Sequence, residues 1–198
     1  MKKIFFFLII VGAAWELYNY SGQVSLGPGV MVSELPQQES IDSPVSYSID
    51  DYSITETAKF SIRAKVLSRK NYHIGREADL SPIDLALGWG NMSDEVVLEK
   101  IKISQSRRFY RWHVESFPIP RREIETHSAN MHIIPANDKV KSVIDRVRKG
   151  DIIEISGSLV NVMSNTDDWH WSSSLTRNDT GKGACELIWV ESLDIVTL

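Results

Sequence analysis

Apolar and polar residues alternate along much of the chain after residue 56, and this alternation predicts β-strands. In residues 60–66, the apolar Phe60, Ile62, Ala64 and Val66 alternate with polar or basic residues, which is the period of a half-buried strand. Residues 107–114 follow the same period, with Tyr110, Trp112 and Val114 on one side and Phe109, Arg111 and His113 on the other. Further strands are predicted in residues 151–162, 169–172 and 185–196.

Two segments have the period of a helix instead. The clearer one follows Asn137, where Val140, Val143, Ile144 and Val147 fall at i, i+3, i+4 and i+7 and Gly150 is placed to end the helix. A shorter helix is predicted after Ser93, which can cap it, with Asp94 and Glu95 in the first turn. The pattern as a whole therefore predicts a mostly β (α+β) fold with two helices.

The order of these segments resembles a known architecture. The clearer helix leads through Lys149-Gly150-Asp151 into a long strand with Gly157 in its middle, where a bulge or bend is expected. This order resembles small barrels of the oligonucleotide/oligosaccharide-binding (OB) kind. The resemblance implies a small OB-like β-barrel with two helices over residues 56–198. Residues 84–90 and 127–132 also look like segments of membrane-anchored bacterial proteins of unknown function, which implies no activity.

The start of the chain indicates a cellular compartment. Lys2 and Lys3 precede an unbroken apolar run from Ile4 to Ala14, as in an export signal or a short membrane anchor. The run reaches a membrane-spanning length only if it continues to Tyr20, so we predict that residues 1–20 are a signal-anchor. This predicts a single-pass inner-membrane protein with its C-terminal domain in the periplasm. The alternative is a signal peptide that is cleaved near Ala14, which would leave a secreted or periplasmic domain.

Residues 21–55 are rich in Ser, Gly, Pro, Gln and Asp and predict an extended tether between the membrane segment and the domain, the second half of which could lie along the domain surface. The net charge of the chain is −4, but its distribution is uneven. Residues 100–149 contain 12 Lys and Arg against 5 Asp and Glu, a local charge of +7 that leaves about −11 for the remainder. This basic segment could face anionic phospholipid, a glycan polyanion or nucleic acid, or could pack beside the acidic remainder.

Two groups of residues are candidates for catalysis or metal binding. Cys185 is the only cysteine, so an intrachain disulfide cannot form, and the side chain is either buried and inert or exposed and reactive. Glu186 beside it would oppose a thiolate. His127 and His132 are five residues apart, which places them on different faces of either a helix or a strand. We therefore predict no metal site and no cofactor, and keep Cys185, His127 and His132 as the catalytic alternative.

A basic and aromatic surface is the stronger candidate. Cations and aromatic rings are mixed in residues 107–113 and again around residues 169–183, and barrel faces bind sugars and single strands with such side chains. In both segments one aromatic face could instead fill the core. The predicted binding residues are Arg108, Arg111, Trp112, His113, Trp169, Trp171 and Arg177.

These observations favour a binding or scaffolding domain of the bacterial cell envelope over an enzyme. Its partner would be an envelope protein or a glycan, with the membrane contacted through the N-terminal segment. The compartment disfavours nucleic acid, and the sequence gives no oligomeric state. The alternative is an envelope hydrolase or transferase that uses Cys185 or a site formed by His127 and His132.

Overall fold

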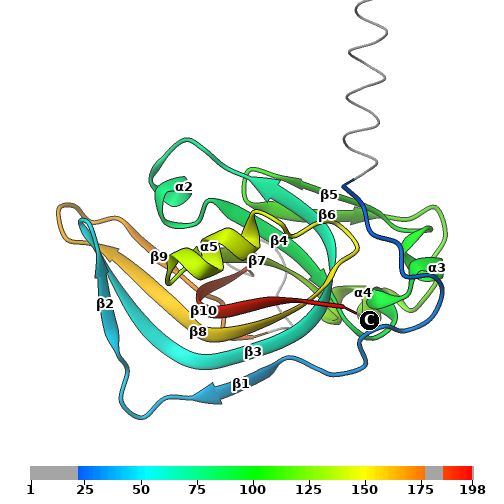
Figure 1. Cartoon of the computed structure of the whole chain (residues 1–198), viewed down its shortest axis with the longest axis horizontal. Helices are drawn as coiled ribbons and strands as arrows, with labels where there is room; N and C mark the ends of the chain where they lie inside the picture. Colours follow the sequence, from blue (N-terminus) through cyan, green and yellow to red (C-terminus); the bar gives the residue numbers. More distant parts are fainter. Residues whose placement is uncertain (1–21, 177–184, 198) are drawn as a thin grey trace, which may run out of the picture.

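The computed structural model describes residues 22–176 and 185–197 (Figure 1). The predicted membrane segment and Arg177 lie outside these ranges. The described chain is mostly β, as predicted. Within these ranges, no helix combines the length and apolar character that crossing a membrane requires.

Five strands pair with one another in an order that returns to its starting strand. β3 (Tyr52–Asn71) pairs with β4 (Ile83–Gly88), which pairs with β7 (Ser128–Pro135), and both pairings are antiparallel. β7 and β10 (Glu186–Val196) are parallel, and β10 is antiparallel to β8 (Ile152–Ser164). β8 in turn pairs with β3. The short β9 (His170–Ser172) extends β8 on its outer side.

The predicted alternation in residues 60–66 is confirmed within β3. Phe60, Ile62, Ala64 and Val66 are all at most 4% exposed and belong to the largest apolar cluster, together with side chains from β4, β7, β8 and β10. Gly157 lies where β8 crosses β10, and a Cβ there would come 2.0 Å from the Trp189 carbonyl oxygen. The pairing register shifts opposite Gly157, between Val190 and Ser192. The predicted irregularity is therefore present, but the extra residue belongs to the partner strand.

The clearer predicted helix is α5 (Asp138–Ile144), which packs against β7 and β10. Its N-cap is Asn137, whose Oδ1 accepts from the Val140 amide at 3.0 Å. Val140, Val143 and Ile144 face the core, and Val147 follows them in the next turn. The helix ends before Gly150, whose positive φ of 94° instead shapes the turn into β8.

The described residues form more helices than the two that the sequence predicts. The described ranges contain four short α-helices and one 3-10 helix, namely α2 (Arg76–Leu80), η1 (Gly90–Ser93), α3 (Glu95–Leu98), α4 (Arg121–Thr126) and α5. The helix expected after Ser93 is α3, but its N-cap is Asp94, whose carboxylate accepts from the Val96 amide at 2.9 Å. Ser93 instead binds the Met31 and Val32 amides through its hydroxyl.

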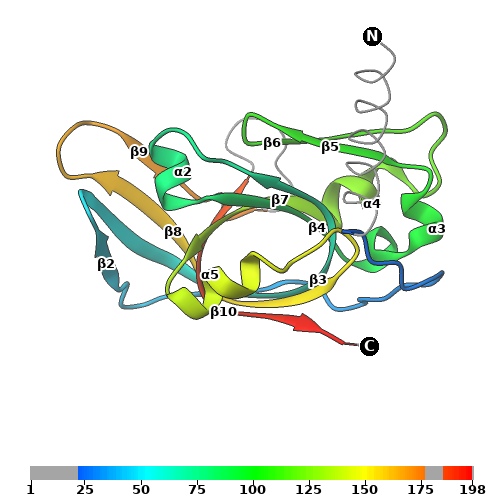
Figure 2. The same cartoon turned by 45° about the horizontal axis from the view of Figure 1, so that its top comes forward.

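The predicted strand at residues 107–114 forms half of a hairpin that lies on the outside of the main sheet. β6 (Phe109–His113) pairs with β5 (Lys102–Ser106), and the two are joined by Arg107 and Arg108 (Figure 2). The inner side of the hairpin contributes Ile103, Tyr110 and Trp112 to an apolar cluster with Leu67, Ala86, Met92 and Ile124. Phe109, Arg111 and His113 alternate with these residues and are exposed, so the predicted two sides of this strand are confirmed.

The described part of the predicted tether, residues 22–55, packs on the rest of the domain. β1 (Gln37–Ser40) and β2 (Ser46–Ile49) both pair with β3. Upstream of β1, Val32 is 1% exposed and packs in the main core. Tyr47 of β2 stacks on Trp189 with ring centroids 4.8 Å apart. These contacts make residues 22–55 part of the folded domain, so its boundary lies well before residue 56.

Candidate binding site

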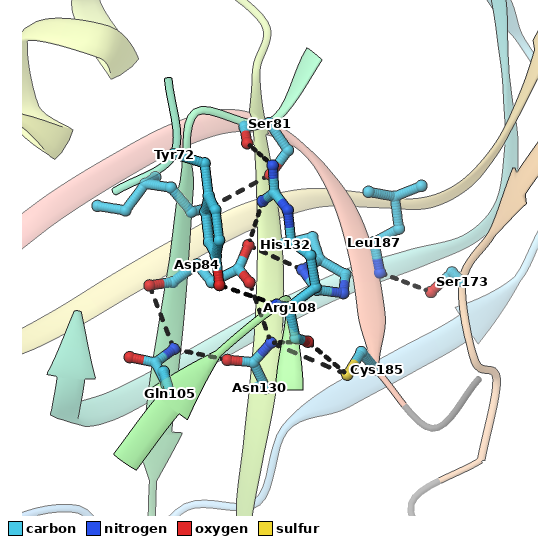
Figure 3. A network of polar contacts seen from close by, with 11 residues as sticks. Tyr72, Ser81, Asp84, Gln105, Arg108, Asn130, His132, Ser173, Cys185 and Leu187 are labelled. Atoms are coloured by element: carbon cyan, nitrogen blue, oxygen red, sulfur yellow. Dashed lines mark hydrogen bonds and ion pairs between the residues drawn. The ribbon is translucent and has the colours of Figure 1, made fainter. Parts of the chain in front are cut away.

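The central residue of the site, Asp84, lies on β4 and is completely buried. Its Oδ1 accepts from Arg108 NH1 at 2.6 Å and lies 2.8 Å from His132 Nδ1 (Figure 3). Its Oδ2 is 3.4 Å from Asn130 Nδ2. Because a carboxylate oxygen accepts hydrogen bonds, Nδ1 of His132 is the donor in this contact.

Arg108 reaches this carboxylate because of the turn that joins β5 and β6. Ser106 and Phe109 are paired, so Arg107 and Arg108 form a two-residue loop, and both have positive φ, 52° and 68°. Positive φ at both central positions is the conformation of a type I′ turn, which usually holds Asn and Gly. In this turn the Arg108 side chain points back toward β4 rather than outward along the hairpin (Figure 3).

Several other groups hold the Arg108 side chain and backbone in place. Its guanidinium lies 3.8 Å from the centre of the Tyr72 ring, and NH2 donates to the Ser81 carbonyl at 2.9 Å. The Tyr72 hydroxyl accepts from the Arg108 amide at 2.9 Å. Burial raises the pKa of Tyr72, so this hydroxyl is neutral at physiological pH. The guanidinium is thus fixed by an aromatic face, a carbonyl and a carboxylate.

A second layer of polar groups surrounds Asn130 on β7. Asn130 Oδ1 accepts from Gln105 Nε2 at 2.6 Å, and Asn130 Nδ2 is 3.3 Å from the Arg108 carbonyl. Cys185 is half-buried at the start of β10, with its Sγ 3.8 Å from Asn130 Nδ2 and 3.8 Å from the same carbonyl. The cysteine therefore belongs to the cluster that Asp84 organises (Figure 3).

A row of aromatic rings continues the site away from Asp84. Trp171 of β9 lies 4.8 Å from the His132 ring and 5.6 Å from the Arg108 guanidinium. Trp169 follows at 6.3 Å from Trp171 and contacts Tyr52 at 5.6 Å in an edge-on arrangement. Trp169, Trp171 and Tyr72 are all half-buried, so each presents part of a ring to solvent. We call Tyr52, Trp169, Trp171, His132, Arg108 and Tyr72 the aromatic row.

The outer end of the aromatic row is also held by an ion pair. Arg76 lies 5.2 Å from the Trp169 ring centre and donates twice to Asp167, at 3.1 and 2.8 Å. Hydrogen bonds from Arg76, Ser164 and the Trp169 amide lower the pKa of Asp167, so its carboxylate is ionised at neutral pH. Arg108, which belongs to the aromatic row, and Arg76, which contacts it, are therefore each paired with a carboxylate.

The structure brings together only some of the predicted binding residues. Arg108, Trp169 and Trp171 are neighbours in the aromatic row. Arg111 and His113 face outward on the hairpin, and Trp112 lies on its inner side, half-buried and 5.8 Å from the Arg121 guanidinium. The single basic and aromatic surface that the sequence suggested is therefore divided into two, and Arg177 lies outside the described residues.

The two predicted histidines have different surroundings. His127 follows α4, where its Nδ1 lies 3.2 Å from the Glu123 carbonyl oxygen and 3.1 Å from the Thr126 hydroxyl. Its ring sits under Gly90, where an added Cβ would come within 2.8 Å of it. His132 instead faces Asp84. Within residues 22–176 and 185–197, no group of three or more His, Cys, Asp or Glu side chains is placed to hold a metal ion.

Sequence reasoning missed Asp84, Asn130, Tyr72 and Gln105. A signal for two of them exists, because Asp84 is the lone charge inside the apolar segment of residues 83–88. Asn130 and His132 alternate with the buried Met131 and Ile133, which places both polar side chains on one face of β7. Charged and polar residues are rarely buried unless they are paired, so such positions predict a polar cluster.

Searches against protein-family models, curated proteins and solved structures find no match for this chain. The interpretation of the site therefore depends on its geometry.

Proposed function

We propose that this chain is a binding domain of the bacterial cell envelope, built as an OB-like barrel and held at the inner membrane by its N-terminal segment. The strand pairings support the OB-like barrel. Five strands pair in the order β3, β4, β7, β10, β8 and again β3, with β7 and β10 as the parallel pair. α5 stands between the third and fourth of these strands along the chain, β7 and β8.

The observation that carries the proposal is the position of the aromatic row. It lies over β4 and β7, the second and third strands in this order of five, next to the loop between β3 and β4. OB folds bind oligosaccharides and oligonucleotides on the corresponding strands and loops. Partly exposed rings beside a few oriented polar groups are the usual composition of a small-ligand site.

The charges favour a sugar or peptide over a nucleic acid. Affinity for nucleic acid comes largely from cations that neutralise phosphates. Here Arg108 is paired with Asp84 and Arg76 with Asp167, so neither guanidinium brings uncompensated charge to the aromatic row. Ring faces and fixed hydrogen-bonding groups remain, which suits the apolar faces and hydroxyls of a glycan. An envelope protein that presents an extended segment is the second partner class.

The test is a titration of the full chain, in detergent, with soluble peptidoglycan fragments, followed by tryptophan fluorescence. We expect saturable binding that Trp171→Ala weakens by about fivefold, because aromatic contacts contribute about 1 kcal/mol each. The matched control is Phe117→Ala, which removes an aromatic ring that is 53% exposed and lies outside the row. Equal affinities of the Trp171 and Phe117 variants would contradict the assignment, as would a lack of binding to any fragment.

The alternative function is an envelope hydrolase or transferase. It is favoured by one observation, that Cys185 lies in the same cluster as Asn130 and the Asp84–His132 pair. His127 does not belong to this cluster. A catalytic cysteine requires a thiol that ionises easily. If iodoacetamide alkylates Cys185 in the folded chain at neutral pH as fast as it alkylates an accessible small thiol of low pKa, this result favours an enzyme over a binding domain.

A further inference from the structure

The first described residues of the chain come soon after the apolar run. The Val24 amide donates to the Lys149 carbonyl at 2.8 Å, and Gln23 forms a bridge with Lys149. The Glu95 carboxylate accepts from the Leu26 and Gly27 amides at 2.7 and 3.1 Å. Only residues 15–22 separate these contacts from Ala14. Eight residues reach at most about 28 Å when fully extended, so a membrane anchor would keep the domain close to the bilayer.

The same contacts decide which part of the domain is nearest to the anchor. Residues 24–27 lie against Lys149 and α3, and α3 leads within a few residues into β5. The Gly150 amide donates to Val66, whose neighbour Leu67 packs with Ile103 of β5. Figures 1 and 2 both show the start of the described chain on the side of the molecule that carries β5, α3 and α4, and β2 at the opposite end.

The outward side of the β5–β6 hairpin is basic and partly aromatic. Three exposed cations, Lys102, Arg107 and Arg111, lie on its outer side or its tip, together with His113. Residues 102–114 contain no Asp or Glu. Phe109 on the same side is 38% exposed, and Phe117 in the following loop is 53% exposed. We call Lys102, Arg107, Phe109, Arg111 and His113 the hairpin face.

We infer that the hairpin face lies on the anionic phospholipid surface of the membrane that anchors the chain. This inference rests on the proposed tethering. Cations near an anionic bilayer strengthen association by about fivefold each, and exposed phenylalanine rings insert at the headgroup level. A domain held within about 28 Å of the bilayer meets lipid at a high effective concentration, which favours lipid over a soluble polyanion. The aromatic row is a separate surface and remains available to its own ligand.

The experiment places a fluorescent probe on the hairpin face of the full chain in lipid vesicles. Ser104→Cys, in a Cys185→Ser background, adds a single thiol opposite Arg111 for labelling with NBD. Vesicles carry a quencher on the lipid headgroup and contain either phosphatidylcholine alone or phosphatidylcholine with phosphatidylglycerol. We expect strong quenching only with phosphatidylglycerol. The matched probe at Ser48→Cys, exposed on β2 at the far end of the molecule, should show little quenching in either vesicle.

Charge variants test the cause of the docking. Replacing Lys102, Arg107 and Arg111 together by Gln should lower the docking equilibrium constant roughly a hundredfold and remove the quenching at residue 104. The matched control replaces the exposed Lys139, Lys141 and Arg146 by Gln and should leave it unchanged. Circular dichroism checks that each variant folds. Equal quenching in both vesicles, or equal quenching at residues 48 and 104, would overturn the inference, as would a hairpin variant that docks normally.

Flotation of the same samples in a density gradient distinguishes the two proposals. A chain that does not float with either vesicle contradicts the tethering itself. A chain that floats with both vesicles but shows no quenching at residue 104 keeps the tethering and overturns only the docking of the hairpin face. If soluble heparin, but not vesicles with phosphatidylglycerol, changes the fluorescence of the probe at residue 104, the hairpin face binds a glycan polyanion and the lipid assignment is wrong.

Discussion

At the scale of single residues, the turn at Arg107 and Arg108 is held in an unusual conformation by the partners of Arg108. A non-glycine residue with positive φ costs roughly 1 kcal/mol or more, and this turn contains two in succession. The ion pair of Arg108 with the buried Asp84 offsets that cost, as does the contact with the Tyr72 ring. In return, the turn supplies the cation that pairs with the buried Asp84 side chain.

The first stability prediction concerns this ion pair. Arg108→Ala removes the guanidinium that pairs with a fully buried carboxylate, and we expect the free energy of unfolding to fall by about 3–5 kcal/mol. Urea denaturation followed by circular dichroism measures the change. The control is Arg111→Ala on the same hairpin, whose guanidinium is exposed and bonds only to Ser106 in the described contacts. That change should cost less than about 1 kcal/mol, and similar losses for both variants would contradict the role of Arg108.

At the scale of elements, α3 and the two residues before it hold the segment of residues 25–32 in place. The side chains of Ser93, Asp94 and Glu95 accept hydrogen bonds from backbone amides between Leu26 and Val32. Glu95 also pairs with Lys65, whose side chain is only 3% exposed, at 2.7 Å. The backbone amides of this irregular segment have no strand or helix to bond with, so these three successive side chains accept their hydrogen bonds instead.

This arrangement predicts a pH dependence of stability. Burial of Glu95 raises its pKa, but hydrogen bonds from Lys65, Ser25 and the Leu26 amide outweigh this effect and lower the pKa to about 2. Because the folded pKa lies below the unfolded value of 4.5, Glu95 stabilises the fold above pH 4.5. That stabilisation, up to about 3 kcal/mol, is lost as the pH falls toward 2.

Glu95→Gln should therefore flatten the rise in unfolding free energy between pH 2 and 4.5. Chemical denaturation at a series of pH values checks this. Glu99→Gln, an exposed position one turn later, should keep the rise of the original chain. Parallel pH profiles for the Glu95 variant and the unaltered protein would show that this carboxylate does not hold the segment.

The elements also show why some strands could be predicted and others could not. β3 buries one face, so its apolar residues alternate and the sequence predicts it. β1 is exposed along its whole length and β2 is only half-buried, so neither has an apolar pattern that distinguishes it from a polar linker. Likewise Trp112 and Arg111 lie on opposite sides of β6, as predicted. The inward direction of the Arg108 side chain depends on its ion pair with Asp84, which is distant in the sequence, so the local alternation of residues does not predict it.

At the scale of the whole molecule, the folded unit includes residues 22–55 as well as the residues from 56 onward. β1, β2 and Val32 cover parts of β3 and the main core that would otherwise face solvent. A Cβ on Gly150 would come within 1.8 Å of the Val24 carbonyl oxygen, so the N-terminal segment and the start of β8 are packed tightly. The alternation in the sequence predicts β3, β8 and β10, but it does not predict β4 and β7, and the edge of the domain depends on contacts between distant segments.

The boundary can be tested by truncation. A chain that starts at residue 22 should unfold cooperatively in urea, because it retains all the described contacts. A chain that starts at residue 56 loses Val32, β1, β2 and the stacking of Tyr47 on Trp189, and we expect it to lose most of its stability of about 5–15 kcal/mol or to stay unfolded. Tryptophan fluorescence and circular dichroism during denaturation distinguish these results. Equal midpoints for the two chains would restore the later boundary.

The pairing of β3 with β8 has a consequence for how the protein is made. Their pairing joins Tyr52 to Ser164, and the set of pairings between the five strands is complete only when β10 has also been made. Contacts between such distant parts of a chain form slowly. If the chain is exported from its N-terminus, β3 crosses the membrane long before β8 and β10 have emerged, and its apolar side chains wait without partners. Folding is then delayed until translocation is nearly complete, and during that interval the emerging chain depends on chaperones in the receiving compartment.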